Sequence, residues 1–198
     1  YTICNLYYDT DGYDLIRTSL DKPVYKEKLR MRSYGRADRE HPVFMELKKK
    51  YRSIVYKRRL TLPYGRALDC LTGDCPWPET QIGREIGYAM DFYPDLEPRV
   101  FLSYERDSWY APESGLRITF DDAIRFRTAD LTLDSDLWGT ALLRPDQVLM
   151  ELKAPGAIPL WMVRLLTEMG LYKTSFSKYG TAYQILLEQE YKGGKRYA

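Results

Sequence analysis

Residues 26–32, with the sequence KEKLRMR, constrain the fold of this chain more than any other segment. In an extended strand, alternate side chains project from opposite faces, so Lys26, Lys28, Arg30 and Arg32 share one face. The apolar residues between them face the other way. The segment therefore predicts a β-strand with one strongly basic face and one face suited to packing in a core.

The same alternation recurs in several later segments. The residues that it places on such faces are Lys48, Lys57, Arg59, Arg106, Arg117 and Lys153, with the carboxylates Glu46 and Glu151 among them. An ordinary solvent-facing strand mixes charges of both signs, whereas these faces are almost entirely positive although the chain carries 28 acidic residues against 30 basic ones. This sorting favours a shared surface for a chain of phosphates carrying a divalent metal over a merely solvated sheet.

The composition excludes several classes of protein. A chain of 198 residues with 44% hydrophobic content supports one sizeable domain. Its net charge of +2 gives no overall basic excess that would require nucleic acid. No apolar run is long enough to cross a bilayer, and the first residues do not show the charged start and apolar core that are typical of a secretory signal. We expect a cytoplasmic protein, with the cytoplasmic face of a membrane as a further option.

Histidine and cysteine usage argues against several kinds of catalytic or metal site. The single histidine, His41, precedes a proline at a strand entrance and is interpreted as a turn residue. The three cysteines contain no Cys-x-x-Cys pair, which disfavours a zinc site or a disulfide framework. Cys70 and Cys75 flank a turn and could bridge, although free thiols in a reducing compartment are the favoured interpretation.

Strands and short helices are predicted to alternate along the chain. Strands are expected at residues 1–9, 23–34, 43–50, 53–62, 99–110, 116–126 and 147–154, and helices at 11–20, 64–71, 79–92, 160–169 and 175–191. The apolar stripe of Trp161, Met162 and Leu165 is expected to pack against the sheet. With no internal repeat or linker, the pattern predicts one α+β domain with an antiparallel sheet of about seven visible strands.

Antiparallel sheets of this size commonly curl or close, and a barrel of about eight strands can hold one small ligand. If the basic faces turned inward, each unpaired cation would cost on the order of several kcal/mol. Water, internal carboxylates and a bound polyanion would offset that repulsion. We therefore expect an antiparallel β-barrel with flanking helices around a basic tunnel.

Seven short segments, in order along the chain, resemble the triphosphate tunnel metalloenzymes, and most closely the polyphosphate polymerase domain of vacuolar transporter chaperone (VTC) complexes and its bacterial relatives. The segments are 5–9 (NLYYD), 29–35 (LRMRSYG), 44–48 (FMELK), 104–106 (YER), 116–121 (LRITFD), 149–153 (LMELK) and 176–180 (FSKYG). The family pattern has a charged strand ahead of the first segment. The resemblance therefore implies a single VTC-like triphosphate tunnel domain over residues 1–198 that lacks its first strand.

The resemblance also implies residue roles. The catalytic set would be Arg30, Arg32, Lys48, Arg106, Arg117 and Lys178, and further substrate-binding residues would be Lys26, Lys28, Lys57, Arg59 and Lys153. Glu151 resembles the metal-binding glutamate and Glu46 would assist it, with Mn²⁺ or Mg²⁺ taking part of its oxygen shell from phosphates. Within residues 57–59, the strand alternation is interpreted as turning Lys57 and Arg59 inward.

The activity that the resemblance implies is metal-dependent transfer of the γ-phosphoryl group of ATP to a growing polyphosphate chain. A tri- or polyphosphatase, a nucleoside triphosphatase and a non-catalytic polyphosphate-binding module remain alternatives, because the same cations would bind the same polyanion. Nucleic-acid binding is disfavoured, since strand aromatics such as Tyr34, Tyr104 and Trp109 are more often core residues. A membrane-protein partner outside this chain is left open.

Overall fold

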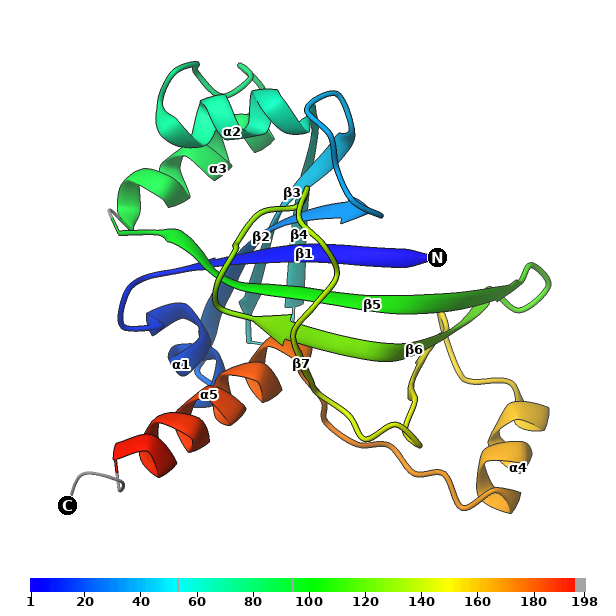
Figure 1. Cartoon of the computed structure of the whole chain (residues 1–198). Helices are drawn as coiled ribbons and strands as arrows, with labels where there is room; N and C mark the ends of the chain where they lie inside the picture. The colour runs from blue at the N-terminus through cyan, green and yellow to red at the C-terminus, as the bar shows by residue number, and fades with distance from the viewer. Residues whose placement is uncertain (53, 94, 195–198) are drawn as a thin grey trace.

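The structure is a computed structural model that describes residues 1–52, 54–93 and 95–194. Ser53, where one predicted strand begins, and the last four residues of the predicted domain, 195–198, lie outside the described residues. In the described part of the chain, eight strands form one sheet with five flanking helices (Figure 1). This confirms the predicted α+β class.

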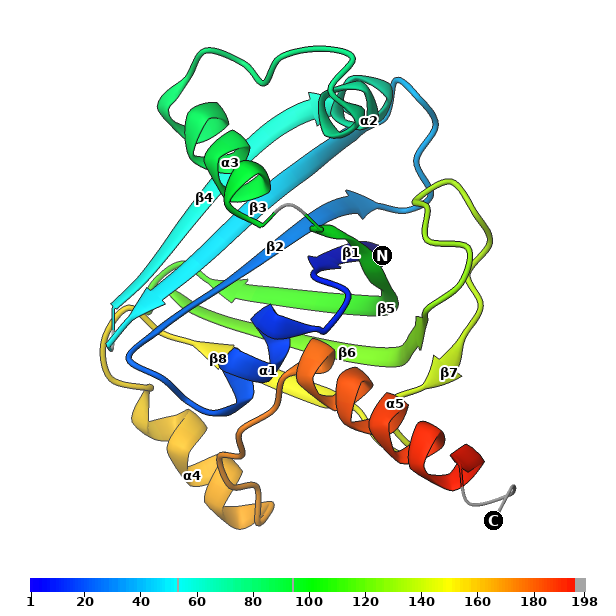
Figure 2. The ribbon, with the colours of Figure 1, turned by 90° about the vertical axis from the view of Figure 1, so that its left-hand side faces the viewer.

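The strands follow the order β4-β3-β2-β1-β5-β6-β7 across the sheet, and β8 pairs with β6. Their bounds are β1 (Thr2–Asp9), β2 (Tyr25–Tyr34), β3 (Pro42–Tyr51), β4 (Ile54–Pro63), β5 (Glu97–Ala111), β6 (Leu116–Arg127), β7 (Thr140–Ala141) and β8 (Leu149–Lys153). Every pairing is antiparallel, as predicted. Figure 2 shows β2, β3 and β4 crossing steeply over β5 and β6, which gives the sheet a strong twist.

The predicted closed barrel is not formed by the described residues. β4 pairs only with β3, and β7 and β8 both pair with β6, at Arg125–Phe126 and at residues 117–121 respectively. Because β7 has two residues and β8 has five, neither can extend the whole ladder from β6 toward β4. The sheet is therefore curved and open, and the prediction of closure is corrected to this extent.

One face of strands β1 to β4 packs against α2 (Tyr64–Thr72) and α3 (Gln81–Phe92). Alternate strand residues Leu29, Met31 and Met45 are fully buried there against apolar helix residues. Each such burial contributes about 1.5–3 kcal/mol. A slip of one residue would move lysines and arginines into this core, so the core fixes the register that sorts the charges.

The other face of the sheet is partly covered by α1 (Asp14–Leu20) and α5 (Lys178–Gly194). Their residues Ile16, Tyr179 and Ala182 pack on apolar residues of β1, β5 and β6, such as Leu102 and Phe126. Figure 1 shows α1 and α5 at the lower left, away from α2 and α3 at the top. The part of this face beyond α5 carries the charged residues described below.

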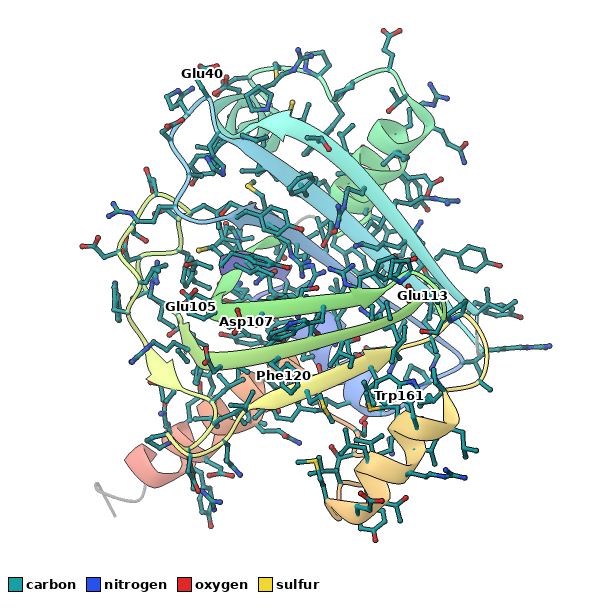
Figure 3. All side chains as sticks on the ribbon, turned by 90° about the vertical axis from the view of Figure 1, so that its right-hand side faces the viewer. Glu40, Glu105, Asp107, Glu113, Phe120 and Trp161 are labelled. Atoms are coloured by element: carbon teal, nitrogen blue, oxygen red, sulfur yellow. The ribbon has the colours of Figure 1, made fainter. Side chains whose placement is uncertain are left out.

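Helix α4 (Leu160–Glu168) corrects one prediction. Met162 is buried, but Trp161 is 56% exposed and Leu165 is 42% exposed, so the expected packing of this stripe against the sheet is wrong for both. The irregular and largely exposed segments on either side carry the helix away from the strands. Figures 1 and 3 show α4 standing apart, with Trp161 at the surface.

Candidate functional site

Cross-strand pairing gathers the predicted basic residues on one face of the sheet. Arg30 lies opposite Glu46, which lies opposite Arg59 on the next strand, and the same alternation continues through β5, β6 and β8. Residues directly opposite each other share a face. We call this surface the cationic face, and its predicted members are Lys26, Lys28, Arg30, Arg32, Lys48, Lys57, Arg59, Arg106, Arg117 and Lys153, with Lys178 from α5.

Neighbouring residues point to the opposite face of the sheet. Arg58 pairs with Glu85 of α3 at 3.0 Å, away from Lys57 and Arg59. Figure 3 looks onto the opposite face of β5 and β6, where Glu105 and Asp107 lie at the surface. The register therefore turns neighbouring charged residues of a single strand to opposite faces of the sheet.

Glu46 is the centre of the first charge cluster, although its side chain is only 1% exposed. Its Oε2 lies 2.7 Å from both Nε and Nη2 of Arg30, and its Oε1 accepts from Arg59 at 2.6 and 2.8 Å and lies 2.7 Å from Lys57 Nζ. Arg32 is 3.8 Å away. Burial alone would raise the pKa of the Glu46 carboxyl, but these four cations hold it at about 2. Glu46 is therefore an ionised counterion shared by three strands.

Asp121 is the centre of the second cluster and is fully buried. Its carboxylate accepts two hydrogen bonds from Arg106, at 2.5 and 2.7 Å, and one from Lys178 at 2.5 Å. The Tyr104 ring lies under both cations, 5.1 Å from Arg106 and 4.6 Å from Lys178. Burial would raise the pKa of Asp121, but Arg106 and Lys178 lower it below its ordinary value.

Sequence reasoning placed Asp121 in a family segment but assigned it no role. Its position two residues from Thr119 and four from Arg117, on the same strand alternation, is the signal that could have assigned it to this face. What the alternation could not give is the partner Lys178, which starts a helix 57 residues later. Only the folded chain brings that lysine to the carboxylate.

Two further residues of β1 were missed although they lie in the segment NLYYD. Asn5 Oδ1 accepts a hydrogen bond from Arg32 Nε at 2.9 Å, and the Tyr7 hydroxyl accepts one from Arg30 Nη1 at 3.0 Å. The Tyr7 ring stacks on Tyr179 with centroids 4.5 Å apart. Burial would raise the pKa of Tyr7, but Arg30 and Arg32 lower it. These neutral groups hold the two arginines in place.

Asp9, at the end of the same strand, joins the helices instead of the cations. It accepts hydrogen bonds from the backbone N–H groups of Leu15 and Ile16 at 2.8 and 3.0 Å and from the Tyr179 hydroxyl at 2.8 Å. Burial raises the pKa of this carboxyl. Because Tyr179 follows Lys178, Asp9 helps to set where Lys178 enters the cationic face.

The other predicted cations are held less tightly. Lys26 Nζ donates to the Ser19 carbonyl at 2.8 Å, and Lys28 Nζ donates to Ser177 Oγ at 3.4 Å. Burial lowers the pKa of Lys28. Arg117 is exposed, as is Lys48, which lies directly opposite Lys28. The structure thus gathers six of the predicted residues around the two carboxylates and arranges the others at the edges of the face.

The predicted metal ligands fall in different surroundings. Glu46 is surrounded by cations, whereas the Glu151 side chain is 44% exposed with Lys153 Nζ 3.0 Å away. Thr119 lies directly opposite Glu151, and its buried Oγ1 has no hydrogen-bond partner among the described residues. In the same ranges, no group of three or more histidine, cysteine or carboxylate residues forms a metal cage. A carboxylate and a hydroxyl are oxygen donors of the kind that Mg²⁺ and Mn²⁺ accept, and phosphate oxygens would have to complete the shell.

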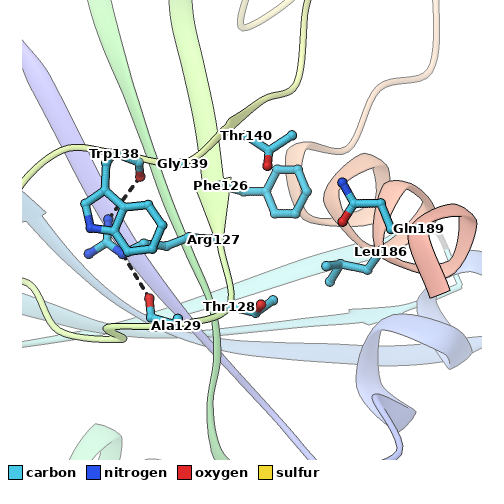
Figure 4. Close-up of a pocket in the computed structure, with 9 residues that line it drawn as sticks. All are labelled: Phe126, Arg127, Thr128, Ala129, Trp138, Gly139, Thr140, Leu186 and Gln189. Atoms are coloured by element: carbon cyan, nitrogen blue, oxygen red, sulfur yellow. Dashed lines mark hydrogen bonds between the residues drawn. The ribbon is translucent and has the colours of Figure 1, made fainter. Parts of the chain in front are cut away.

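A separate pocket of about 260 Å³ lies between β6 and α5 (Figure 4). Arg127 on its wall is 4% exposed and packs its guanidinium 3.6 Å from the centre of the Phe101 ring. It donates to the carbonyls of Ala129 and Trp138 at 3.0 and 3.3 Å. Arg127 therefore organises the loop after β6, and Phe101 belongs to the core on the opposite side of the sheet from the cationic face.

Comparison with known proteins shows the family and the fold of this chain. The family model of the VTC domain matches residues 1–187. A solved structure from Bacillus halodurans, described as a candidate adenylate cyclase, superposes with a TM-score of 0.51 at 15% identity and covers 89% of this chain and 78% of that chain, which shows a shared fold. The comparison with curated proteins gave no match. In the described ranges, the helices are too short or too polar to cross a membrane. Because the family match spans nearly the whole sequence, the chain belongs to the VTC domain family.

Proposed function

We propose that this protein binds ATP and polyphosphate on the cationic face and transfers the γ-phosphoryl group of ATP to the growing polyphosphate chain with the help of Mn²⁺ or Mg²⁺. One observation carries the proposal. Lysines and arginines of β2 to β6, β8 and α5 converge on one face, where they outnumber the carboxylates Glu46, Asp121 and Glu151. This surplus of positive charge favours an anionic guest.

The spacing of the cations suits a chain of phosphates. The four basic residues from Lys26 to Arg32 alternate along β2 and span about 20 Å, given about 3.3 Å per strand residue. A row of basic side chains of this length matches an extended polyanion better than a single phosphate. Arginines offer forked pairs of N–H groups to phosphate oxygens, and lysines act as point charges.

The two buried carboxylates support a catalytic role because they fix cations before the substrate arrives. Arg30 uses Nε and Nη2 on Glu46 and Nη1 on Tyr7, and Arg106 uses Nε and Nη2 on Asp121. Groups held in this way need little reorganisation when charge develops on the transferring phosphoryl group. The phosphates of bound ATP would lie among these cations.

The protein has little covalent chemistry to perform in such a reaction. The terminal phosphate of the acceptor chain attacks the γ-phosphorus in line, and the bond to the β-phosphate oxygen breaks to release ADP. Arg30, Arg106 and Lys178 neutralise the charge on the phosphate oxygens and hold them in line. When bound, a divalent metal would add charge neutralisation there, held by Glu151 and Thr119 together with phosphate oxygens.

The decisive experiment is product analysis after incubation of the protein with ATP and Mn²⁺. Long acid-labile phosphate chains with ADP are the expected products. Orthophosphate with ADP alone would replace the proposal with hydrolysis. Tight triphosphate binding without turnover, unchanged in Glu151→Gln, would replace it with a binding module.

A matched pair of variants tests the binding face itself. Arg59→Ala should weaken triphosphate binding about tenfold in calorimetry, on the scale of one lost charge-assisted hydrogen-bonded contact. Arg58→Ala removes the same side chain one position away, where it contacts Glu85 on the other face, and should leave the affinity unchanged. Equal effects from the two variants would overturn the assignment of the face. In a competition assay, tripolyphosphate should displace polyphosphate that is bound to the cationic face, whereas single-stranded DNA should not displace it.

A further inference from the structure

Two cysteines face each other at the end of α2, remote from the cationic face. The sulfur atoms of Cys70 and Cys75 are 2.9 Å apart, and both residues are free thiols. Cys70 is 5% exposed and packs with the helical layer, whereas Cys75 is partly exposed. A disulfide bond is about 2.05 Å long, so the two sulfur atoms need to approach by less than about 1 Å.

The backbone places the pair together without help from the thiols. Helix α2 ends at Thr72, and Gly73 takes a left-handed conformation with φ 84° and nothing within 4 Å of where a Cβ would lie. The Cys75 N–H then donates to the Asp69 carbonyl at 3.1 Å, and the Thr72 hydroxyl donates to the Asp74 carboxylate at 2.6 Å. This turn folds Cys75 back onto the last turn of the helix.

We propose that Cys70 and Cys75 are a modification site, a dithiol that is converted to an intramolecular disulfide by a low-molecular-weight disulfide such as oxidised glutathione. Cys75 is the more exposed of the two thiols and reacts first with the oxidant. Its thiolate attacks one sulfur of the oxidant, forms a mixed disulfide and expels one glutathione thiolate. Cys70 then gives up its proton and attacks the Cys75 sulfur, which expels the second glutathione. Two protein thiols are oxidised, and one disulfide is reduced to two thiols.

The surroundings of Cys70 support this order of events. Burial, together with the neighbouring Cys75, raises the pKa of the Cys70 thiol to about 11. A group held as a thiol is a poor first nucleophile. It becomes the resolving group once a mixed disulfide lies within reach, because the turn has already set the distance.

The bridge would act on the helical layer and not directly on phosphate binding. Tyr64, Ala67 and Cys70 of α2 pack toward the core on the side of the sheet opposite the cationic face. Closing the short loop restricts the unfolded chain, so oxidation should raise the melting temperature by about 5 °C in a domain of this size. Reduction should reverse the shift.

The test is a non-reduced peptide map after treatment of the full chain with oxidised glutathione and alkylation in denaturant. We expect a peptide in which Cys70 is joined to Cys75, while Cys4, which is fully buried, is alkylated. Cys75→Ser should abolish both the joined peptide and the melting shift. Cys4→Ala keeps the pair and should retain both, which makes it the matched control.

Three results would overturn the proposal. One is a stable mixed disulfide on Cys75 with Cys70 still alkylated, which would mean that the second step does not occur. Another is equal alkylation of all three cysteines, which would mean that the pair has no special reactivity. The third is a bridge that includes Cys4. The peptide map of the unaltered protein distinguishes these results even if a variant fails to fold.

Discussion

Glu46 and Asp121 are both buried carboxylates on the cationic face, but they gather their partners in different ways. Arg30 and Arg59 lie 16 and 13 residues from Glu46, on strands joined to β3 directly along the chain. Asp121 draws Arg106 from the preceding strand, but Lys178 comes from 57 residues away at the start of α5. The Glu46 cluster is completed within three neighbouring strands, whereas the Asp121 cluster also requires a helix to dock.

The largest effect should follow from Glu46→Gln. The change leaves Arg30, Arg59 and Lys57 without their shared negative charge in a buried position. Removing one partner of a buried ion pair costs about 3–5 kcal/mol, so we expect a loss of this size in the unfolding free energy measured with urea. Added triphosphate should restore much of the stability by replacing the lost anion. A loss smaller than that of Asp121→Asn would contradict the ranking of the two clusters.

The pH dependence of stability should report the Glu46 cluster. The pKa of Glu46 in the folded protein is about 2, below its ordinary value of 4.5. Its contribution is therefore present above about pH 4.5 and is lost as the pH falls toward 2, by an amount on the order of 3 kcal/mol. Urea unfolding of the parent protein and of Glu46→Gln across this window should converge at low pH. Curves that stay parallel would show that Glu46 is not held ionised.

Asp121→Asn should have a smaller effect on stability, about 2–3 kcal/mol, because two cations lose the charge instead of four. The substitution should also have an effect that is confined to helix α5. With Lys178 released, amide hydrogen exchange should accelerate in α5 while exchange in β2 to β4 stays unchanged. Lys178→Met removes the same link from the other side and should give the same pattern in α5. Equal acceleration across the whole sheet would show that the two clusters form one unit.

The contrast also explains what could be predicted from the sequence. Strand alternation was enough to predict that the basic residues of β2, β3 and β4 share a face, because register and local hairpins decide it. The partners Asn5 and Tyr7 were missed because neutral side chains carry no charge signal. The role of Asp121 was missed because its partner Lys178 lies 57 residues along the chain and reaches it only in the folded protein. Closure of the sheet was predicted from the strand number, the inward basic faces and the family resemblance. The described residues do not close the sheet, because β7 and β8 share the edge of β6 and β4 pairs with β3 at the other end.

The smallest effect is expected at Thr119, whose buried hydroxyl has no hydrogen-bond partner among the described residues. Thr119→Val keeps the shape of the side chain and removes that unsatisfied group, so stability should rise by up to about 1 kcal/mol. If the hydroxyl serves a phosphate or metal oxygen shell beside Glu151, Mn²⁺-dependent triphosphate affinity should fall several-fold in the same variant. Thr119→Ser retains the hydroxyl and should keep the affinity. Higher stability with unchanged affinity would make Thr119 a packing residue and would leave Glu151 as the sole protein oxygen donor at this end of the face.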